Sequence, residues 1–216
     1  MEMKKVILIG DSIRMGYCKY VKDALVGAAD VYYPNENCRF AEHVLRFLHE
    51  WKKKGEWGED IDLVHWNAGL WDCLELFDDE PLTSLSYYGE AVARIDKRIR
   101  KLFPRAKVVF ATSTSVVESL YNENFRRHNG IIEEYNRVAK EALKNTDTVI
   151  NDLYKVSLSA TDKHRSDATH FNTDAGCELM GGAVLSVICR ELGIAASEIK
   201  IENFEPEKYS ADSIGY

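Results

Sequence analysis

The stretch KKVILIGDS at residues 4–12 decides the expected fold. Its four consecutive apolar residues, 6–9, predict a strand that is buried on both faces, and Gly10 ends that strand. Strands of this kind belong to the interior of a parallel sheet, because helices then cover both faces. Asp11 and Ser12 therefore lie where the chain leaves the sheet for its first helix.

Short apolar runs and helical patterns alternate along the rest of the chain. We expect further strands at residues 30–33, 61–66, 107–111 and 148–150, and helices at residues 17–26, 41–55, 86–103, 131–143 and 173–192. Apolar strands that are each followed by a helix predict a parallel sheet with right-handed crossovers. The expected fold class is α/β: a three-layer α/β/α sandwich around a five-stranded parallel sheet.

The length of 216 residues is that of one domain. We see no repeat and no linker rich in proline, glycine or serine. Residues 1–200 are expected to form this single domain, and residues 201–216 an irregular, acidic C-terminal tail.

Charge and hydropathy exclude several kinds of partner. The chain has 35 acidic and 28 basic side chains and a net charge of −7, which argues against binding nucleic acid. The longest uncharged run, residues 179–189, is too short to cross a bilayer, and the apolar run at residues 6–9 is too short for a signal peptide. We expect a cytoplasmic protein with no membrane partner.

The cysteines are also consistent with a cytoplasmic protein. They stand at positions 18, 38, 73, 177 and 189, an odd number with no C-x-x-C pair. This pattern suits neither a disulfide scaffold nor a zinc site, so we expect reduced and mostly buried thiols. No phosphate-loop or dinucleotide motif is present, so the sequence gives nucleotide binding no support.

Catalytic groups are expected beyond the carboxyl ends of the strands, where open α/β sheets form their sites. Ser12 stands at a tight turn between strand and helix, which suits a nucleophile whose transition state carries an oxyanion. Read alone, Gly10-Asp11-Ser12 is equally good turn and helix-cap chemistry.

A second polar segment, Asp167-Ala168-Thr169-His170, precedes the last helix. With a spacing of three, the carboxylate of Asp167 can orient the imidazole of His170 while the other ring nitrogen takes a proton from Ser12. Asp-x-x-His is common by itself. Its position and that of Ser12, both in loops at the end of the sheet, make the combination informative.

These two segments resemble the SGNH, or GDSL, hydrolase superfamily of esterases and lipases. Gly10-Asp11-Ser12 matches its first sequence block and residues 167–170 match its last, and the resemblance extends from residue 6 to about 192. It implies a three-layer α/β/α fold, Ser12 as nucleophile, His170 as general base and then acid, and Asp167 as the residue that orients it. It implies no metal and no organic cofactor.

The two middle blocks depart from the family pattern. The loop at residues 34–40 lacks the glycine whose N–H helps to bind the oxyanion, and Gly69-Leu70-Trp71-Asp72 has Trp71 where the family has an asparagine. We expect the replacement donors to be the Ser12 N–H, the Asn67 side chain, and one N–H at Asn37, Cys38 or Gly69. Asn67 is also consistent with a structural amide at the end of its strand.

The remaining candidates are weaker. His65, inside a strand, is expected to be a core residue, and His43 and His49 are not spaced as a ligand pair. His128 and His164 are expected in loops, and Asp11 is expected to fix its turn rather than to act as a base.

The expected function is that of a serine esterase acting on a short-chain acyl ester, preferably acetyl, of a carbohydrate or another small alcohol. Trp66, Trp71 and Phe40 fall near the loops at the sheet end, and aromatic faces suit sugar rings. The sequence leaves two alternatives open. One is a non-catalytic binding protein with a degraded oxyanion hole, and the other is a flavodoxin-like cofactor binder.

Overall fold

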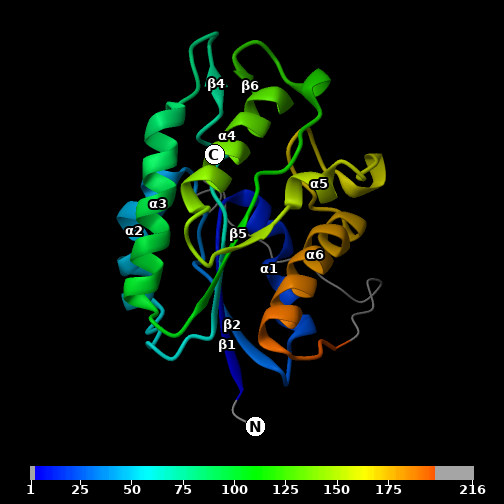
Figure 1. Cartoon of the computed structure of the whole chain (residues 1–216). Coiled ribbons are helices and arrows are strands. Elements are labelled where there is room, and N and C mark those ends of the chain that lie inside the picture. The colour runs from blue at the N-terminus through cyan, green and yellow to red at the C-terminus, as the bar shows by residue number, and fades with distance from the viewer. Residues whose placement is uncertain (1–2, 198–216) are drawn as a thin grey trace.

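Five strands form one sheet at the centre of the molecule (Figure 1). Every neighbouring pair is parallel, and the order across the sheet is β2 (Ala29–Tyr32), β1 (Lys4–Ile9), β3 (Leu63–Trp66), β5 (Lys107–Ala111) and β7 (Val149–Asn151). The computed structural model describes residues 3–197, so the expected tail at residues 201–216 lies outside the described residues.

Helices cover both faces of the sheet. α2 (Ala41–Lys54), α3 (Leu85–Leu102) and α4 (Asn129–Leu143) pack side by side on one face, whereas α1 (Ser12–Ala24), α6 (Asp174–Leu192) and the short α5 (Leu153–Ser157) lie on the other (Figure 1). The expected α/β class and the five-stranded parallel sheet are confirmed. Within the described part of the chain, no helix is both long and apolar enough to span a membrane.

Smaller elements lie at the carboxyl end of the sheet and were not expected from the sequence. A two-stranded antiparallel ribbon, β4 (Glu75–Leu76) and β6 (Phe125–Arg126), projects beyond the strand ends (Figure 1). Two 3₁₀ turns, Glu118–Leu120 and Asp162–His164, lie in the loops. These elements span two or three residues, too few for a sequence period to show.

The expected start of the first helix was wrong. α1 begins at Ser12 rather than at residue 17, and Asp11 is its N-cap, with Oδ1 accepting a hydrogen bond from the Ile13 N–H at 3.0 Å. The first turn is buried on every side, so its residues do not alternate between apolar and polar as an amphipathic helix does. The helical period becomes readable only after this turn.

The core confirms the expected burial of His65 and corrects the expectation that the Trp66 ring could face a sugar. His65 is fully buried in β3, and burial lowers its pKa to about 3, so the ring is neutral. The Trp66 side chain is also fully buried and packs against Phe110 with ring centroids 4.8 Å apart. Because Trp66 points into the core, its ring is not available to a sugar. All five cysteines are free, and four of them are buried.

Asp72 ties the loop after β3 to the start of α2. Its two carboxylate oxygens lie 3.1 and 3.0 Å from the backbone nitrogen of Ala41 and accept its N–H, while the N-cap residue Phe40 offers no side-chain acceptor. Burial raises the pKa of this carboxyl to about 7, although hydrogen bonds from Ala41 and Thr83 oppose the shift. Asp72 therefore caps α2 from another loop at an electrostatic cost.

This cost predicts a pH-dependent stability. Between the usual carboxyl pKa near 3.8 and the folded value of about 7, the native state holds a proton that the unfolded chain has released. The free energy of unfolding should therefore fall as pH rises through this window, by roughly 4 kcal/mol at most. Asp72→Asn keeps an acceptor for Ala41 and removes the titration, so urea unfolding at pH 5 and pH 8 should show a flatter profile.

The same comparison should show the asparagine variant to be more stable than the wild type at pH 8. Asp79→Asn, on an exposed loop residue, is the matched control and should leave the pH profile unchanged. Equal pH dependence in the wild type and Asp72→Asn would show that Asp72 is not the group that titrates.

Candidate active site

Ser12 and His170 are 158 residues apart in sequence and meet at the carboxyl edge of the sheet. Ser12 is the first residue of α1, directly after β1, and His170 lies in the segment that leads into α6. Because α1 and α6 pack against each other on one face, their N-terminal ends share this edge. The Nε2 atom of His170 lies 2.8 Å from the Oγ atom of Ser12.

Asp167 holds the other side of the imidazole. Nδ1 of His170 lies 2.8 Å from Oδ2 and 3.0 Å from Oδ1 of Asp167. Oδ1 also accepts the backbone N–H groups of Thr169 at 2.7 Å and His170 at 2.8 Å. Burial alone would raise the pKa of Asp167, but the hydrogen bond from His170 and these N–H groups hold it well below its usual range. The carboxylate is therefore ionised and keeps Nδ1 protonated.

The loop after β5 fixes the turn that carries this pair. The Val117 N–H donates to the carbonyl of Ala168 at 2.9 Å, and the hydroxyls of Tyr121 and Thr169 lie 2.5 Å apart. Arg165 adds two hydrogen bonds to Ser115, at 3.1 Å to its carbonyl and 2.9 Å to its hydroxyl. These contacts fix the position of the imidazole relative to the sheet.

The three side chains together have the geometry of a proton relay. With Nδ1 protonated by its contact to the carboxylate, Nε2 is the acceptor for the Ser12 hydroxyl. Ser12 and His170 are buried residues, each only 8% exposed. A sheltered site of this kind strengthens electrostatic interactions at the serine oxygen.

The expected oxyanion donors have different hydrogen-bond environments in the structure. Ser12 is in the first helical turn, where backbone N–H groups have no partner within the helix, so its N–H remains suitable. The Cys38 N–H is an unsuitable choice, because it already donates to the carbonyl of Gly10 at 3.1 Å. In the same loop, the Asn37 side chain accepts the Arg39 N–H at 2.9 Å, and a role of the Asn37 N–H as an oxyanion donor stays a prediction.

Asn67 packs against the turn at residues 10–12. A Cβ atom on Gly10 would lie 1.9 Å from the Oδ1 atom of Asn67, so the amide occupies the space that the glycine leaves open. A hydrogen bond from Asn67 also lowers the pKa of Asp11, which burial raises. The amide therefore supports the Gly10–Asp11 backbone, and its role as an oxyanion donor stays a prediction.

Gly69 and Trp71 lie in the loop after β3. Gly69 has a φ of 141°, a conformation that favours glycine, and a Cβ there would lie 2.2 Å from the Ser113 hydroxyl. The Trp71 side chain is partly exposed, as is that of Phe40, unlike that of Trp66. Contacts of Gly69 and Trp71 with an oxyanion or a substrate stay predictions.

The other histidines have contacts that belong to the scaffold. His43 packs on Phe47 in α2, and His128 lies 3.1 Å from Glu118. His164 accepts the Thr161 N–H at 3.0 Å and so caps a 3₁₀ turn. Sequence reasoning missed Arg14, a fully buried cation two residues after Ser12. The sequence did contain a signal for Arg14, because it is a basic residue among the apolar residues that follow Ser12 in the first turn of α1.

The contact between Gly10 and Asn67 predicts the effect of adding one methyl group. Gly10→Ala should destabilise the fold by about 1–3 kcal/mol, because the new Cβ meets Asn67 at 1.9 Å and the Cβ of Arg14 at 2.8 Å. Gly182→Ala is the control, since a Cβ on this glycine of α6 meets nothing within 4 Å. It should be neutral or stabilising by up to about 1 kcal/mol. Urea unfolding measures both, and equal stability of the two variants would contradict the packing.

Solved structures share this fold over nearly the whole chain. A lipase/acylhydrolase from Enterococcus faecalis aligns with a TM-score of 0.66 and 21% identity over 95% of this chain and 100% of that one. The acetyl xylan esterase AlAXEase aligns with a TM-score of 0.66 and 17% identity, over 85% and 99% of the two chains. A GDSL-like lipase from Bacteroides thetaiotaomicron aligns with a TM-score of 0.65 and 16% identity, over 87% and 88%.

No protein-family model matches the chain, and no curated protein matches it. The likeness lies in the architecture, at identities too low to carry an activity across. The chain has the three-layer α/β/α fold of the SGNH, or GDSL, hydrolases.

Proposed function

We propose that the protein is a serine esterase in which Ser12, His170 and Asp167 form the catalytic triad. The observation that carries this proposal is the 2.8 Å contact between the Ser12 hydroxyl and Nε2 of His170, whose Nδ1 faces the Asp167 carboxylate at 2.8 Å. The residues come from loops far apart in sequence, yet they lie in the order that acyl transfer requires. The fold shared with lipases, acylhydrolases and esterases supports the same class of reaction.

The reaction follows from these contacts in two stages. Nε2 of His170 takes the Ser12 proton as Oγ bonds to the ester carbonyl carbon, and Asp167 stabilises the imidazolium. The imidazolium then protonates the leaving alcohol as its bond to the acyl carbon breaks. Water attacks the resulting acyl-enzyme with His170 again as base, which releases the acid and restores Ser12.

The tetrahedral intermediates need donors for one negative oxygen. The N–H of Ser12 at the start of α1 supplies one, and the positive end of the helix dipole lies at the same place. The N–H groups of Asn37 and Gly69 are our candidates for the others. A missing donor typically costs about 10²–10³ in rate, so this part of the site sets its efficiency.

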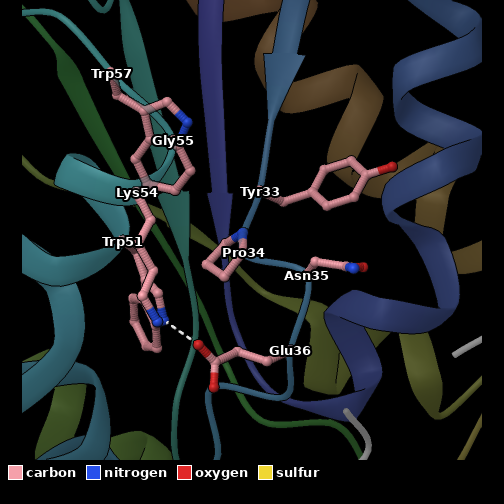
Figure 2. A pocket seen from close by; sticks show the side chains of 8 residues that line it. All are labelled: Tyr33, Pro34, Asn35, Glu36, Trp51, Lys54, Gly55 and Trp57. Atoms are coloured by element: carbon pink, nitrogen blue, oxygen red, sulfur yellow. Dashed lines mark hydrogen bonds between the residues drawn. The ribbon is translucent and has the colours of Figure 1, made fainter. Parts of the chain in front are cut away.

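We assign the substrate to short acyl esters, preferably acetyl, of a carbohydrate or another small alcohol. The structural likeness to an acetyl xylan esterase supports this choice. A groove of about 520 Å³ also supports it (Figure 2), a size common for small-molecule sites. The groove begins at Glu36, which is next to Asn37 in sequence. Its lining combines hydrogen-bonding and aromatic side chains with a proline and a glycine: Tyr33, Pro34, Asn35, Glu36, Trp51, Lys54, Gly55 and Trp57.

A non-catalytic binding protein on the same fold remains the second candidate. The observation in its favour is the set of oxyanion donors, in which the Cys38 N–H is already used and Asn67 packs under Gly10. A binding protein has no need of the Ser12–His170–Asp167 alignment, so we rank it below the esterase.

Substitution of the triad separates the two candidates. Ser12→Ala should lower kcat for p-nitrophenyl acetate by at least about 10³-fold, and Asp167→Asn by about 10³–10⁴-fold, because each removes a member of one proton relay. Ser159→Ala, at an exposed serine, is the control and should be fully active. Turnover that survives Ser12→Ala, or a wild type that neither turns over the ester nor reacts with a phosphonate at Ser12, would favour the binding protein.

Substitutions in the groove test whether it binds the alcohol portion of the ester substrate. Asn35 and Lys54 are exposed and line it, so the double variant Asn35→Ala, Lys54→Ala should fold normally. We expect KM for an acetylated xylo-oligosaccharide to rise at least about fivefold through lost hydrogen bonds, with p-nitrophenyl acetate turnover unchanged. The control is the double variant Asn35→Ala, Lys53→Ala, in which an exposed neighbour outside the groove is substituted and Lys54 is kept. The difference in KM between the two double variants gives the contribution of Lys54. An unchanged KM in the first variant would remove the groove from the substrate site.

A further inference from the structure

Arg14 is a fully buried cation in the first turn of α1. It follows Ser12 by two residues, so its side chain starts close to the nucleophile. Burying a guanidinium costs several kcal/mol in desolvation unless its donors are satisfied. Packing alone would be served as well by a long apolar side chain, so the charge and the donors call for another explanation.

The donors of Arg14 connect two loops of the candidate site. Nε donates to the carbonyl of Gly10 at 3.4 Å, and Nη2 donates to the carbonyl of Glu36. Gly10 belongs to the turn that carries Ser12, whereas Glu36 belongs to the loop after β2. The Cys38 N–H donates to the same Gly10 carbonyl at 3.1 Å. Arg14 and Cys38 thus fasten one loop to the other on both sides of Asn37.

The side chain of Glu36 is held in place as well as its backbone. Its Oε1 atom accepts the indole N–H of Trp51 at 2.6 Å, as Figure 2 shows. The backbone of Glu36 is therefore fixed by Arg14 and its side chain by α2. With both neighbours of Asn37 anchored, the position of the Asn37 N–H relative to Ser12 is set mainly by these contacts.

We propose that Arg14 is a positioning residue for the oxyanion hole: it holds residues 36–38 against the nucleophile turn so that the Asn37 N–H and the Ser12 N–H serve the same oxygen. This inference rests on the proposed esterase function. Arginine suits the task because its planar fork reaches two carbonyls at once, whereas the ammonium of lysine is a single compact charge. A buried positive charge two residues from Ser12 also favours the negative charge that the proposed reaction develops at this turn.

The test is Arg14→Lys, which keeps the charge and loses the fork. We expect kcat/KM for p-nitrophenyl acetate to fall about 10²-fold, the usual cost of one oxyanion donor. The affinity for a boronic acid, whose adduct with Ser12 carries a negative tetrahedral boron, should fall in parallel. Arg100→Lys is the matched control, because Arg100 bonds Asp96 and Thr148 near the start of the last strand, and it should keep full activity.

Amide hydrogen exchange measures directly whether Arg14 holds the loop at residues 36–38. In Arg14→Lys the Cys38 N–H should exchange at least about tenfold faster, while the amides of β1 and β3 stay protected, because only the loop is released. If Arg14→Lys does not fold, Trp51→Phe provides the milder variant. It removes the indole donor to Glu36 together with part of the ring that packs on His43 and Phe47, and it should give a smaller loss of kcat/KM together with faster exchange at Cys38.

The outcomes separate this inference from the proposed function. A wild type that turns over the ester, together with an Arg14→Lys variant within about threefold of it, would overturn the role of Arg14. Equal losses in Arg14→Lys and Arg100→Lys would overturn it too, since they would reflect stability alone. A wild type that is inactive and unlabelled at Ser12 would instead reject the esterase, and exchange at Cys38 would still show whether Arg14 holds the loop.

Discussion

The packing of α1 against α6 is the constraint on which the candidate site depends. The first helix starts at Ser12, and the segment before the last helix carries His170, so the two side chains meet only if these helices lie close together. Gly16 permits this approach, because a Cβ there would lie 2.5 Å from Oδ1 of Asn172. The thiol of Cys177 donates to the Gly16 carbonyl at 3.0 Å and closes the same contact. The 2.8 Å contact between Ser12 and His170 follows from this fit.

Buried polar groups fasten the loops at the carboxyl edge to one another. Asp72, from the loop after β3, caps α2. Asn136 of α4 accepts the Ser113 N–H at 2.8 Å and donates to its carbonyl at 2.9 Å, which fixes the loop after β5. Arg14 joins the loop after β2 to the nucleophile turn. In the proposed reaction, loops held in this way would need little rearrangement as charge develops, which is the condition for electrostatic stabilisation.

The proposed triad and the proposed oxyanion donors differ in how far they follow the sequence pattern that the resemblance implies. Ser12, His170 and Asp167 are arranged as a complete relay, with short contacts on both ring nitrogens. The two middle blocks lack the usual glycine and asparagine, and other groups stand in their place. Asn67 supports the turn from below, and the loop after β2 is fixed by a buried guanidinium. The proposed chemistry therefore relies on backbone N–H groups whose positions come from neighbouring side chains.

The sequence by itself determined the layers, the parallel sheet and the places of Ser12, Asp167 and His170 at its carboxyl edge. It could do so because buried strands leave short continuous apolar runs, amphipathic helices leave a helical period, and parallel strands bring their carboxyl ends to one edge. It misplaced the start of α1, whose first turn is buried all round and shows no period.

Only the tertiary structure decided what each polar group does. Whether the Cys38 N–H is available depends on the carbonyl of Gly10, 28 positions earlier in the printed sequence. The Trp66 ring lies in the core because its strand is covered on both faces, and Arg14 joins two loops that are distant in sequence. Hydrogen bonds and burial between remote segments leave no pattern along the chain, so they become visible only once the helices and loops are packed together.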